Sequence, residues 1–271
     1  MTNLDESAGQ SCARPTPSAF ETAIACYGVL GEQVVDFPHD SFTYVRVEGW
    51  ETPSFSPLLL RPNQPLRPAD LRIIEAFFEQ HPITNPAIEH SPYINVIQAS
   101  GVRIDSVRSA CAEMGWIVDP DPLLLNLLHE LKVVTAPNGF AIEVHPLDAG
   151  QLPPAYRALI RAGFAATDEQ LDYITRALSR RPSWAVLLRE SSGAIAAGGT
   201  VSVRGATGFL TWGTVDPACR QRGLHQVLLD ACWSVAGKQG AARCAYATRN
   251  RLIRDKCDDR VDLLICRKRA P

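Results

Sequence analysis

The chain has 271 residues, of which 46% are hydrophobic and 21% charged, and its formal net charge is −2 at pH 7. This length allows one large domain or two smaller ones, each with a buried core. A net charge so close to zero gives no general attraction to nucleic acid or to an anionic membrane, and no apolar run is long enough to span a bilayer.

Residues 1–18 are polar and rich in small side chains. They contain acidic residues and no continuous apolar segment, so a secretory signal is not expected. Terminal segments of this kind are commonly disordered unless another element holds them. We therefore expect a disordered lead-in over residues 1–18.

The eight cysteines form no C-x-x-C pair, and no histidine flanks them at the spacing of metal ligands. A zinc site needs such spacing, so no metal is expected. Several cysteines, such as Cys232 and Cys244, fall within apolar patterns, which is typical of small buried hydrophobic residues. Free thiols of this kind fit a reducing, cytoplasmic compartment.

Residues 19–136 alternate between strand-like and helix-like patterns, which predicts an N-terminal α/β domain. One helix is clearly marked, because Pro68 opens a run with apolar residues three and four positions apart. The predicted elements are short strands at 32–37 and 42–47, a helix from 68 to about 81, a helix at 104–114 and a strand at 115–118. The apolar segment 123–134 fits a strand or a helix, and the turn at Pro122 favours a strand. The turn-rich sequence at 136–139 marks the predicted domain boundary.

The C-terminal region, residues 139–271, has a more regular pattern. Thr167, with Gln170 three residues later, has the form of a capping box at a helix start. Glycine-containing turns separate runs of strand-like residues and predict hairpins. The predicted elements are a strand at 140–144, a helix at 153–162 ended by Gly163, a helix from 167 to about 178, strands at 184–188, 194–203 and 209–215, a helix at 224–237, and strands at 244–248 and 263–266.

One stretch of this region, residues 214–229, has the pattern of a phosphate-binding unit: an apolar strand, a basic loop, and then helical spacing. A helix start presents free backbone N–H groups and a positive dipole end to an anion. Gly223 lets the backbone approach a ligand closely, and the guanidinium groups of Arg220 and Arg222 suit phosphate. Taken without context, the same residues also fit a surface loop with two solvated arginines.

The order Val-x-Pro-x-x-Arg-x-x-Gly-Leu at this junction resembles the acyl-CoA signature of the GNAT superfamily of N-acetyltransferases. The family pattern is Arg/Gln-x-x-Gly-x-Gly/Ala; Arg220 and Gly223 match it, whereas His225 stands where Gly or Ala is usual. A side chain there either crowds the pyrophosphate or forms a hydrogen bond with it. The element order over 139–271 also resembles the family, which implies an α/β fold with a mixed sheet and GNAT architecture in the C-terminal half.

Under this resemblance the smaller N-terminal domain, residues 19–136, has two interpretations. Its helix, Gly-Trp and strand at 104–118 are similar to the closing helix, Gly-Phe and strand of the family. This similarity suggests a degenerate GNAT-like half, as in bacterial GNAT proteins built of two tandem halves. The domain has no Arg-x-x-Gly-x-Gly loop, so no cofactor is expected there. The alternative is an unrelated α/β cap.

The resemblance also implies which residues hold acetyl-CoA. In the family, two central strands splay apart, and the pantetheine arm of the cofactor pairs with the free edge of the first strand. The loop that follows this strand holds the pyrophosphate. The predicted cofactor-binding residues are Gly213, Thr214, Val215, Arg220, Gln221, Arg222, Gly223, Leu224, His225 and Asn250.

The candidate catalytic residues are Cys257, Asn250 and Tyr246. The family often places a carboxylate on the cofactor strand, and residues 208–215 contain none. It also often has a tyrosine one to two turns after an asparagine that corresponds to Asn250, and Cys257 stands in that place. Its thiol, with basic neighbours that would lower its pKa, could protonate a leaving thiolate; a structural or exposed cysteine is the alternative. Tyr246 is either another acid or a packing residue.

Two functions stay open at this point. The first is an acyl-CoA-dependent N-acyltransferase that moves an acetyl group from acetyl-CoA to a primary amine by direct attack. Its partners would be acyl-CoA and an amine acceptor, either a small molecule or a peptide, with no nucleic acid, membrane or metal. The second is a non-catalytic GNAT-like module that binds CoA or another protein. Either would be a monomer or a homodimer.

Overall fold

The computed structural model describes residues 19–29, 33–35, 37, 39–46, 56–81, 92–97, 103–121, 123–128, 134–147, 151–248 and 259–268. The predicted lead-in at 1–18 lies outside these residues. No helix in the described ranges is long and apolar enough to cross a membrane. The helices are α1 (Ala19–Tyr27), α2 (Pro68–Gln80), α3 (Ile104–Glu113), α4 (Pro154–Phe164), α5 (Asp168–Ser179), the short 3-10 helix η1 (Pro217–Cys219) and α6 (Leu224–Lys238). The strands are β1 (Gln33–Val35), β2 (Phe42–Arg46), β3 (Leu58–Leu60), β4 (Tyr93–Ile97), β5 (Trp116–Val118), β6 (Leu123–Leu128), β7 (Phe140–Pro146), β8 (Ser183–Glu190), β9 (Ile195–Arg204), β10 (Thr207–Val215), β11 (Arg243–Thr248) and β12 (Asp259–Lys268).

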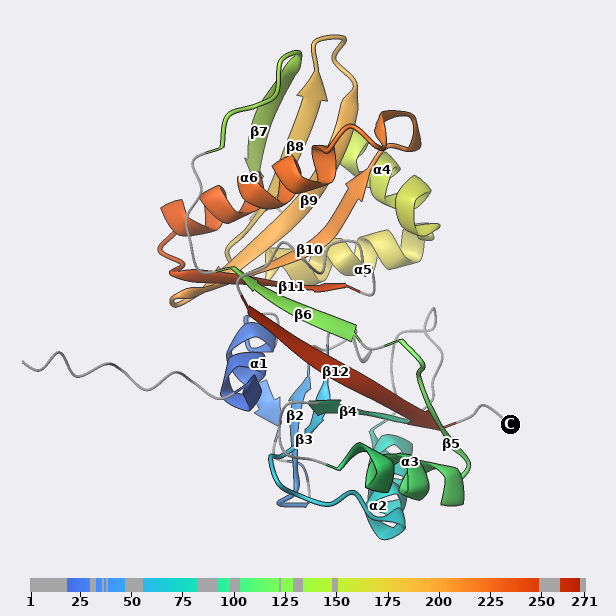
Figure 1. The fold of residues 1–271 in the computed structure, drawn as a ribbon. Coiled ribbons are helices and arrows are strands. Elements are labelled where there is room, and N and C mark those ends of the chain that lie inside the picture. Colours follow the sequence, from blue (N-terminus) through green and yellow to red (C-terminus); the bar gives the residue numbers. More distant parts are fainter. Residues whose placement is uncertain are drawn as a thin grey trace, which may run out of the picture.

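These strands form one mixed sheet, in the order β1-β2-β3-β4-β12-β6-β11-β10-β9-β8-β7, with β5 paired to β12 beside this path (Figure 1). Most neighbours are antiparallel, but β3 runs parallel to β4 and β10 runs parallel to β11. Parallel neighbours need a crossover connection, which α2 provides in the first case and α6 in the second. The predicted α/β class with a mixed sheet is confirmed.

Each half of the sequence contributes a strand to the other half of the sheet. β6 comes from the N-terminal half and pairs antiparallel with β11. β12 comes from the C-terminal end and pairs antiparallel with β4. β6 and β12 also pair with each other, and in Figure 1 they lie side by side in the middle of the molecule. The sheet is therefore continuous across the sequence boundary at 136–139.

The same order of strand pairings occurs twice. In the N-terminal half, β1, β2 and β3 are antiparallel, β4 is parallel to β3, and β12 then pairs antiparallel with β4. In the C-terminal half, β8, β9 and β10 are antiparallel, β11 is parallel to β10, and β6 then pairs antiparallel with β11. This repetition supports a degenerate copy of the fold at the N-terminus rather than an unrelated cap.

Helices cover both faces of the sheet. On one face, α6 buries Trp233 against β8, β9, β10 and β11, and α2 with α3 buries Phe77 over the N-terminal strands. On the other face, α1, α4 and α5 share a core that contains Tyr156 and Leu187. Because neighbouring residues of a strand point to opposite faces, β8 supplies Leu187 to one core and Val186 to the other.

The local sequence explains how α4 and α5 are placed. The predicted capping box at the start of α5 is confirmed: the Thr167 hydroxyl accepts from the Gln170 N–H at 3.2 Å, and Gln170 Oε1 accepts from the Thr167 N–H at 2.8 Å. The prediction that Gly163 ends the preceding helix is wrong, because α4 continues to Phe164. A Cβ at position 163 would overlap the hydroxyl of Thr214, so this glycine lets α4 approach β10 closely.

Candidate functional site

The two parallel strands at the centre of the C-terminal half separate part of the way along β10. The pairing of β10 with β11 runs from Thr207 to Leu210, and from there on the described part of the sheet pairs β10 with β9 alone. The register between β10 and β9 also shifts between Thr211 and Thr214, and Trp212 in this bulge has a φ of 55°. A bulge bends its strand and locally ends pairing. The last residues of β10 therefore turn one backbone edge away from β11.

A cavity of about 350 Å³ opens where these strands separate. Its walls come from both faces of the sheet. His225 and Leu228 belong to α6 on one face, and Phe164 is the last residue of α4 on the other. The cavity therefore passes between β10 and β11 through the sheet. The lining residues are Leu123, Phe164, Gly199, Thr200, Phe209, Leu210, Thr211, Trp212, Gly213, His225, Leu228, Leu229, Cys232, Tyr246, Ala247 and Thr248.

The loop between β10 and α6 leaves several backbone donors available. Asp216 Oδ1 accepts from the Ala218 N–H at 2.8 Å and starts the short helix η1. Gln221 and Gly223 then take left-handed conformations, with φ values of 63° and 73°. Among the described residues, the N–H groups of 221–224 have no hydrogen-bond acceptor. This is the usual condition of a helix N-terminus, and it is the arrangement that binds an anion.

The two arginines of this loop differ in their surroundings. Arg222 donates to Glu190 Oε1 at 3.0 Å and lies over the ring of Phe140 at 4.9 Å from its centroid. This hydrogen bond holds the pKa of Glu190 below its ordinary value. Arg220 is exposed, and its backbone N–H donates to Pro217 O at 3.4 Å. Arg222 is also exposed, but its guanidinium is already engaged with Glu190 of β8.

His225 occupies the mouth of the cavity on the α6 side. It is the second residue of α6, and its Nε2 lies 3.9 Å from the position that a Cβ on Gly213 would take. The imidazole therefore lies over the face of β10 at Gly213, on the side to which a Cβ would point. The departure from Gly or Ala noted in the sequence places a ring over this part of the strand.

On the α4 side the cavity has an aromatic wall. The rings of Phe164 and Trp212 meet edge to face, with centroids 5.3 Å apart, and 47% of the Phe164 surface is exposed. Tyr246 on β11 is buried and lines the cavity. Cys232 of α6 also lines it, and burial raises the pKa of this thiol to about 12, so it is present there as a neutral group.

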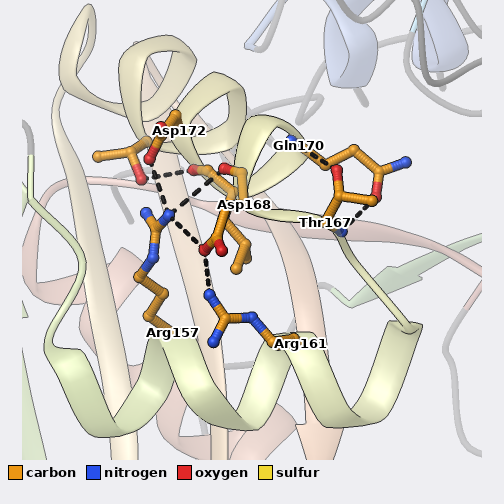
Figure 2. Close-up of polar contacts among 8 residues, drawn as sticks. Arg157, Arg161, Thr167, Asp168, Gln170 and Asp172 are labelled. Atoms are coloured by element: carbon orange, nitrogen blue, oxygen red, sulfur yellow. Dashed lines mark hydrogen bonds and ion pairs between the residues drawn. The ribbon is translucent and has the colours of Figure 1, made fainter.

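A polar network holds α4 against α5 (Figure 2). Arg157 of α4 pairs with Asp168 at 3.1 Å and with Asp172 at 2.8 Å, both on α5, and Arg161 also pairs with Asp168. The hydrogen bond from Arg157 holds the pKa of Asp168 below its ordinary value. Because α4 also contacts β10 through Gly163, this network helps to fix the wall of the cavity.

The predicted site residues fall into two groups. Gly213, the loop 220–225 and Tyr246 surround the cavity or its α6 end, and Thr214 and Val215 follow on the same strand. Asn250 and Cys257 lie outside the described residues. The aromatic wall was missed, because neither Phe164 nor Trp212 belongs to a motif. The Gly163-Phe164 pair was the one signal that could have pointed to it.

Comparisons with known proteins agree on the fold. Neither protein-family models nor curated protein sequences give a match. Among solved structures, a GCN5-related N-acetyltransferase from Kribbella flavida is 15% identical with a TM-score of 0.62, over 93% of this chain and 96% of that chain. A tandem GNAT protein from the clavulanic acid biosynthesis pathway is 13% identical with a TM-score of 0.50, over 79% and 74%. A GCN5-related N-acetyltransferase from Sphaerobacter thermophilus is 16% identical with a TM-score of 0.52, over 74% and 69%. The chain therefore has the GNAT fold, as the loop motif predicted.

Proposed function

We propose that this chain is an acyl-CoA-dependent N-acyltransferase that moves an acetyl group from acetyl-CoA to a primary amine by direct attack. One observation carries the proposal: the cavity opens where β10 leaves β11 and lies beside the start of α6. A helix N-terminus can bind a pyrophosphate, and a free strand edge can bind an extended chain through its backbone. The GNAT fold supplies the precedent for this combination.

The residues present fit acetyl-CoA. The N–H groups of 221–224 would hold the pyrophosphate, with Arg220 as the accessible cation. Gly223 has no atom within 4 Å of the position of a Cβ, so its surface is open to a ligand. Gly213, Thr214 and Val215 would offer the strand edge to the pantetheine arm. When bound, acetyl-CoA supplies the activated acyl group as a thioester.

The acceptor amine would enter from the α4 side, past Phe164 and Trp212. Tyr246 lines the cavity from β11 and is the described candidate for proton donation to the leaving thiolate. Asn250 and Cys257 follow β11 in the sequence and remain proposals for the same task. The acceptor is an amine of a small molecule or a peptide.

A second function is favoured by His225. Its imidazole lies over Gly213 in the lining of the cavity, in place of the small residue that the family motif has. A non-catalytic GNAT-like module that binds CoA or another protein would tolerate a narrowed site better than an enzyme would. Both functions share the fold, so only binding and turnover separate them.

Two measurements, made one after the other, test the proposal. A ligand that binds only the folded state raises the melting temperature, so acetyl-CoA and CoA at concentrations far above micromolar should each shift thermal unfolding. Release of free CoA thiol from acetyl-CoA should then depend on an added amine from a mixed panel. A thermal shift without amine-dependent thiol release would favour the binding module. Absence of any shift would remove both functions.

A further inference from the structure

The bulge in β10 is a strained feature that something must hold in place. Trp212 has a φ of 55°, in the left-handed region that non-glycine residues seldom adopt. Such a conformation persists only where the surrounding contacts determine it. The bulge follows directly after the point where the pairing of β10 with β11 ends, and Trp212 lines the cavity.

One side chain from the neighbouring helix binds the strained residue directly. The hydroxyl of Tyr156 on α4 donates to the carbonyl oxygen of Trp212 at 3.0 Å. Tyr156 is fully buried, and burial raises the pKa of its hydroxyl well above the ordinary value. The hydroxyl therefore stays protonated and remains a donor over the whole physiological pH range.

Two glycines make this contact sterically feasible. A Cβ at Gly198 on β9 would lie 2.5 Å from Cδ2 of the Tyr156 ring, so the ring can reach β10 only because residue 198 has no side chain. Gly163, about two turns further along the same face of α4, lies against Thr214 at the end of the bulge. Helix α4 is thus fitted to the bulge at Trp212 and at Thr214.

A second polar contact supports the same segment from β9. The hydroxyl of Thr200 donates to the carbonyl oxygen of Thr211 at 3.2 Å and lies 2.6 Å from the Thr211 hydroxyl. Both threonines line the cavity. The carbonyl groups of Thr211, the last paired residue before the bulge, and of Trp212 within it therefore accept hydrogen bonds from side chains.

We propose that Tyr156 is a positioning residue that fixes the bulge of β10 and so keeps the strand edge at residues 213–215 presented to acetyl-CoA. This proposal rests on the acyltransferase function proposed above. Tyr156 does not contact the reacting atoms in it; the residue acts through the backbone of Trp212. Its removal should therefore weaken cofactor binding more than it slows the chemical step.

The test compares Tyr156→Phe with a matched variant, Tyr93→Phe. Tyr93 is also buried and its hydroxyl also donates to a backbone carbonyl, that of Ser56 at 2.6 Å, but it lies in the N-terminal half. Both variants keep the ring and remove a hydroxyl that donates to a backbone carbonyl, so their stability losses should be similar. Calorimetry should show about tenfold weaker acetyl-CoA binding for Tyr156→Phe and unchanged binding for Tyr93→Phe. With an active acceptor, the KM for acetyl-CoA should rise about tenfold while kcat changes less than twofold.

Amide hydrogen exchange separates this inference from the function it rests on. In Tyr156→Phe the amides of residues 212–215 should exchange at least tenfold faster than in the wild-type chain, with or without cofactor, and in Tyr93→Phe they should not. Equal binding and equal exchange in the wild type and Tyr156→Phe would overturn the positioning role. Should the wild type fail to bind acetyl-CoA, the proposed function is lost, and unchanged exchange in Tyr156→Phe would then overturn the positioning role separately. Gly198→Ala, which displaces the ring and keeps the hydroxyl, should raise the exchange rate at the same residues.

Discussion

The helices α6 and α2 occupy equivalent places in the two halves of the molecule, yet their N-termini differ in what they can bind. Each connects a pair of parallel strands, β10 to β11 in one half and β3 to β4 in the other. At α6 the chain enters through Gly223 in a left-handed conformation, and the N–H groups of 221–224 have no acceptor among the described residues. At α2 the chain enters through Pro68, which has no N–H group to offer.

The N-terminus of α2 also carries its own anion. The carboxylate of Asp70, in the first turn, accepts from the Arg67 N–H at 2.8 Å, and His39 Nε2 lies 3.7 Å from its other oxygen. Asp70 is 6% exposed. A carboxylate at this position satisfies the positive end of the helix. The same topology thus yields a helix start that is open to an anion in one half and closed by a side chain in the other.

This comparison shows that topology alone does not make an anion site. The repeated pairing order brings a helix start to equivalent places in the two halves, and the residues at the helix start decide the outcome. At α6 a glycine with neighbouring amides that lack a described acceptor leaves the helix start open, whereas at α2 a proline and an aspartate fill it. The predictions below test this difference, beginning with the change that should have the largest effect.

Gly223→Asp should abolish acetyl-CoA binding. Aspartate would place a negative charge where the pyrophosphate is expected, and it would force a residue with a Cβ into a φ of 73°. Isothermal calorimetry measures the binding. The matched control is Gly205→Asp in the β9–β10 hairpin, where φ is 56° and a Cβ also meets open space. It carries the same backbone strain away from the site, so it should bind normally; loss of binding in both variants would contradict the assignment of the loop.

Arg220→Ala should weaken acetyl-CoA binding by about 1–3 kcal/mol, the range for a hydrogen bond to a charged group. Its guanidinium is exposed beside the open amides. Arg222→Ala should have a smaller effect, because Arg222 is already paired with Glu190. Calorimetric titration of both variants with acetyl-CoA at the same salt concentration measures the difference in affinity. A larger loss in Arg222→Ala would show that the Glu190 pair opens when the cofactor binds.

Asp70→Ala should lower the free energy of unfolding by about 1 kcal/mol, because it removes the carboxylate that binds the start of α2. Urea denaturation measures this loss. Acetyl-CoA binding should not change, since α2 lies in the other half of the sheet (Figure 1). Gain of a second acetyl-CoA site, or loss of the first one, would contradict the difference drawn between the N-termini of α2 and α6.

How much of this could be predicted from the sequence varies with the kind of signal. Periodicity found α2 and α6, and the capping box found the start of α5, because local hydrogen bonding and burial determine these features. The spacing of Arg220 and Gly223 predicted a loop before a helix start, and Gly223 does precede α6; cofactor binding at this loop stays a prediction. Exchange of β6 and β12 between the halves was not predicted, because strand pairing depends on contacts far apart in the sequence.

The part of the candidate site that could not be predicted from the sequence is the bulge in β10 and its contacts. Nothing in the residues 211–213 marks a left-handed Trp212, since neighbours on α4 and β9 impose that conformation. Gly163 was interpreted as a helix end because glycine is common there, whereas its cause is the close approach of α4 to β10. Such packing reasons involve two elements at once, and a pattern within one segment does not contain them.

The smallest effect on acetyl-CoA binding is expected from releasing Arg222 from its ion pair with Glu190. In Glu190→Gln the ion pair is lost, and the guanidinium becomes available to the same ligand as Arg220. Acetyl-CoA binding at pH 7 should then tighten about two- to fivefold, the scale of a surface ion pair. Calorimetry with the wild type and Arg222→Ala as references measures the gain, and the double variant should show none of it.

The pH dependence of this gain follows from the pKa of Glu190. The hydrogen bond from Arg222 lowers that pKa below its ordinary value of 4.5, so the pair is fully formed at pH 7. The Arg222–Glu190 ion pair is intact while Glu190 is deprotonated. It is lost as the pH falls through the lowered pKa that Glu190 has in the folded chain. The difference in acetyl-CoA affinity between Glu190→Gln and the wild type should therefore be constant from pH 8 to about pH 5 and shrink only below pH 4.5.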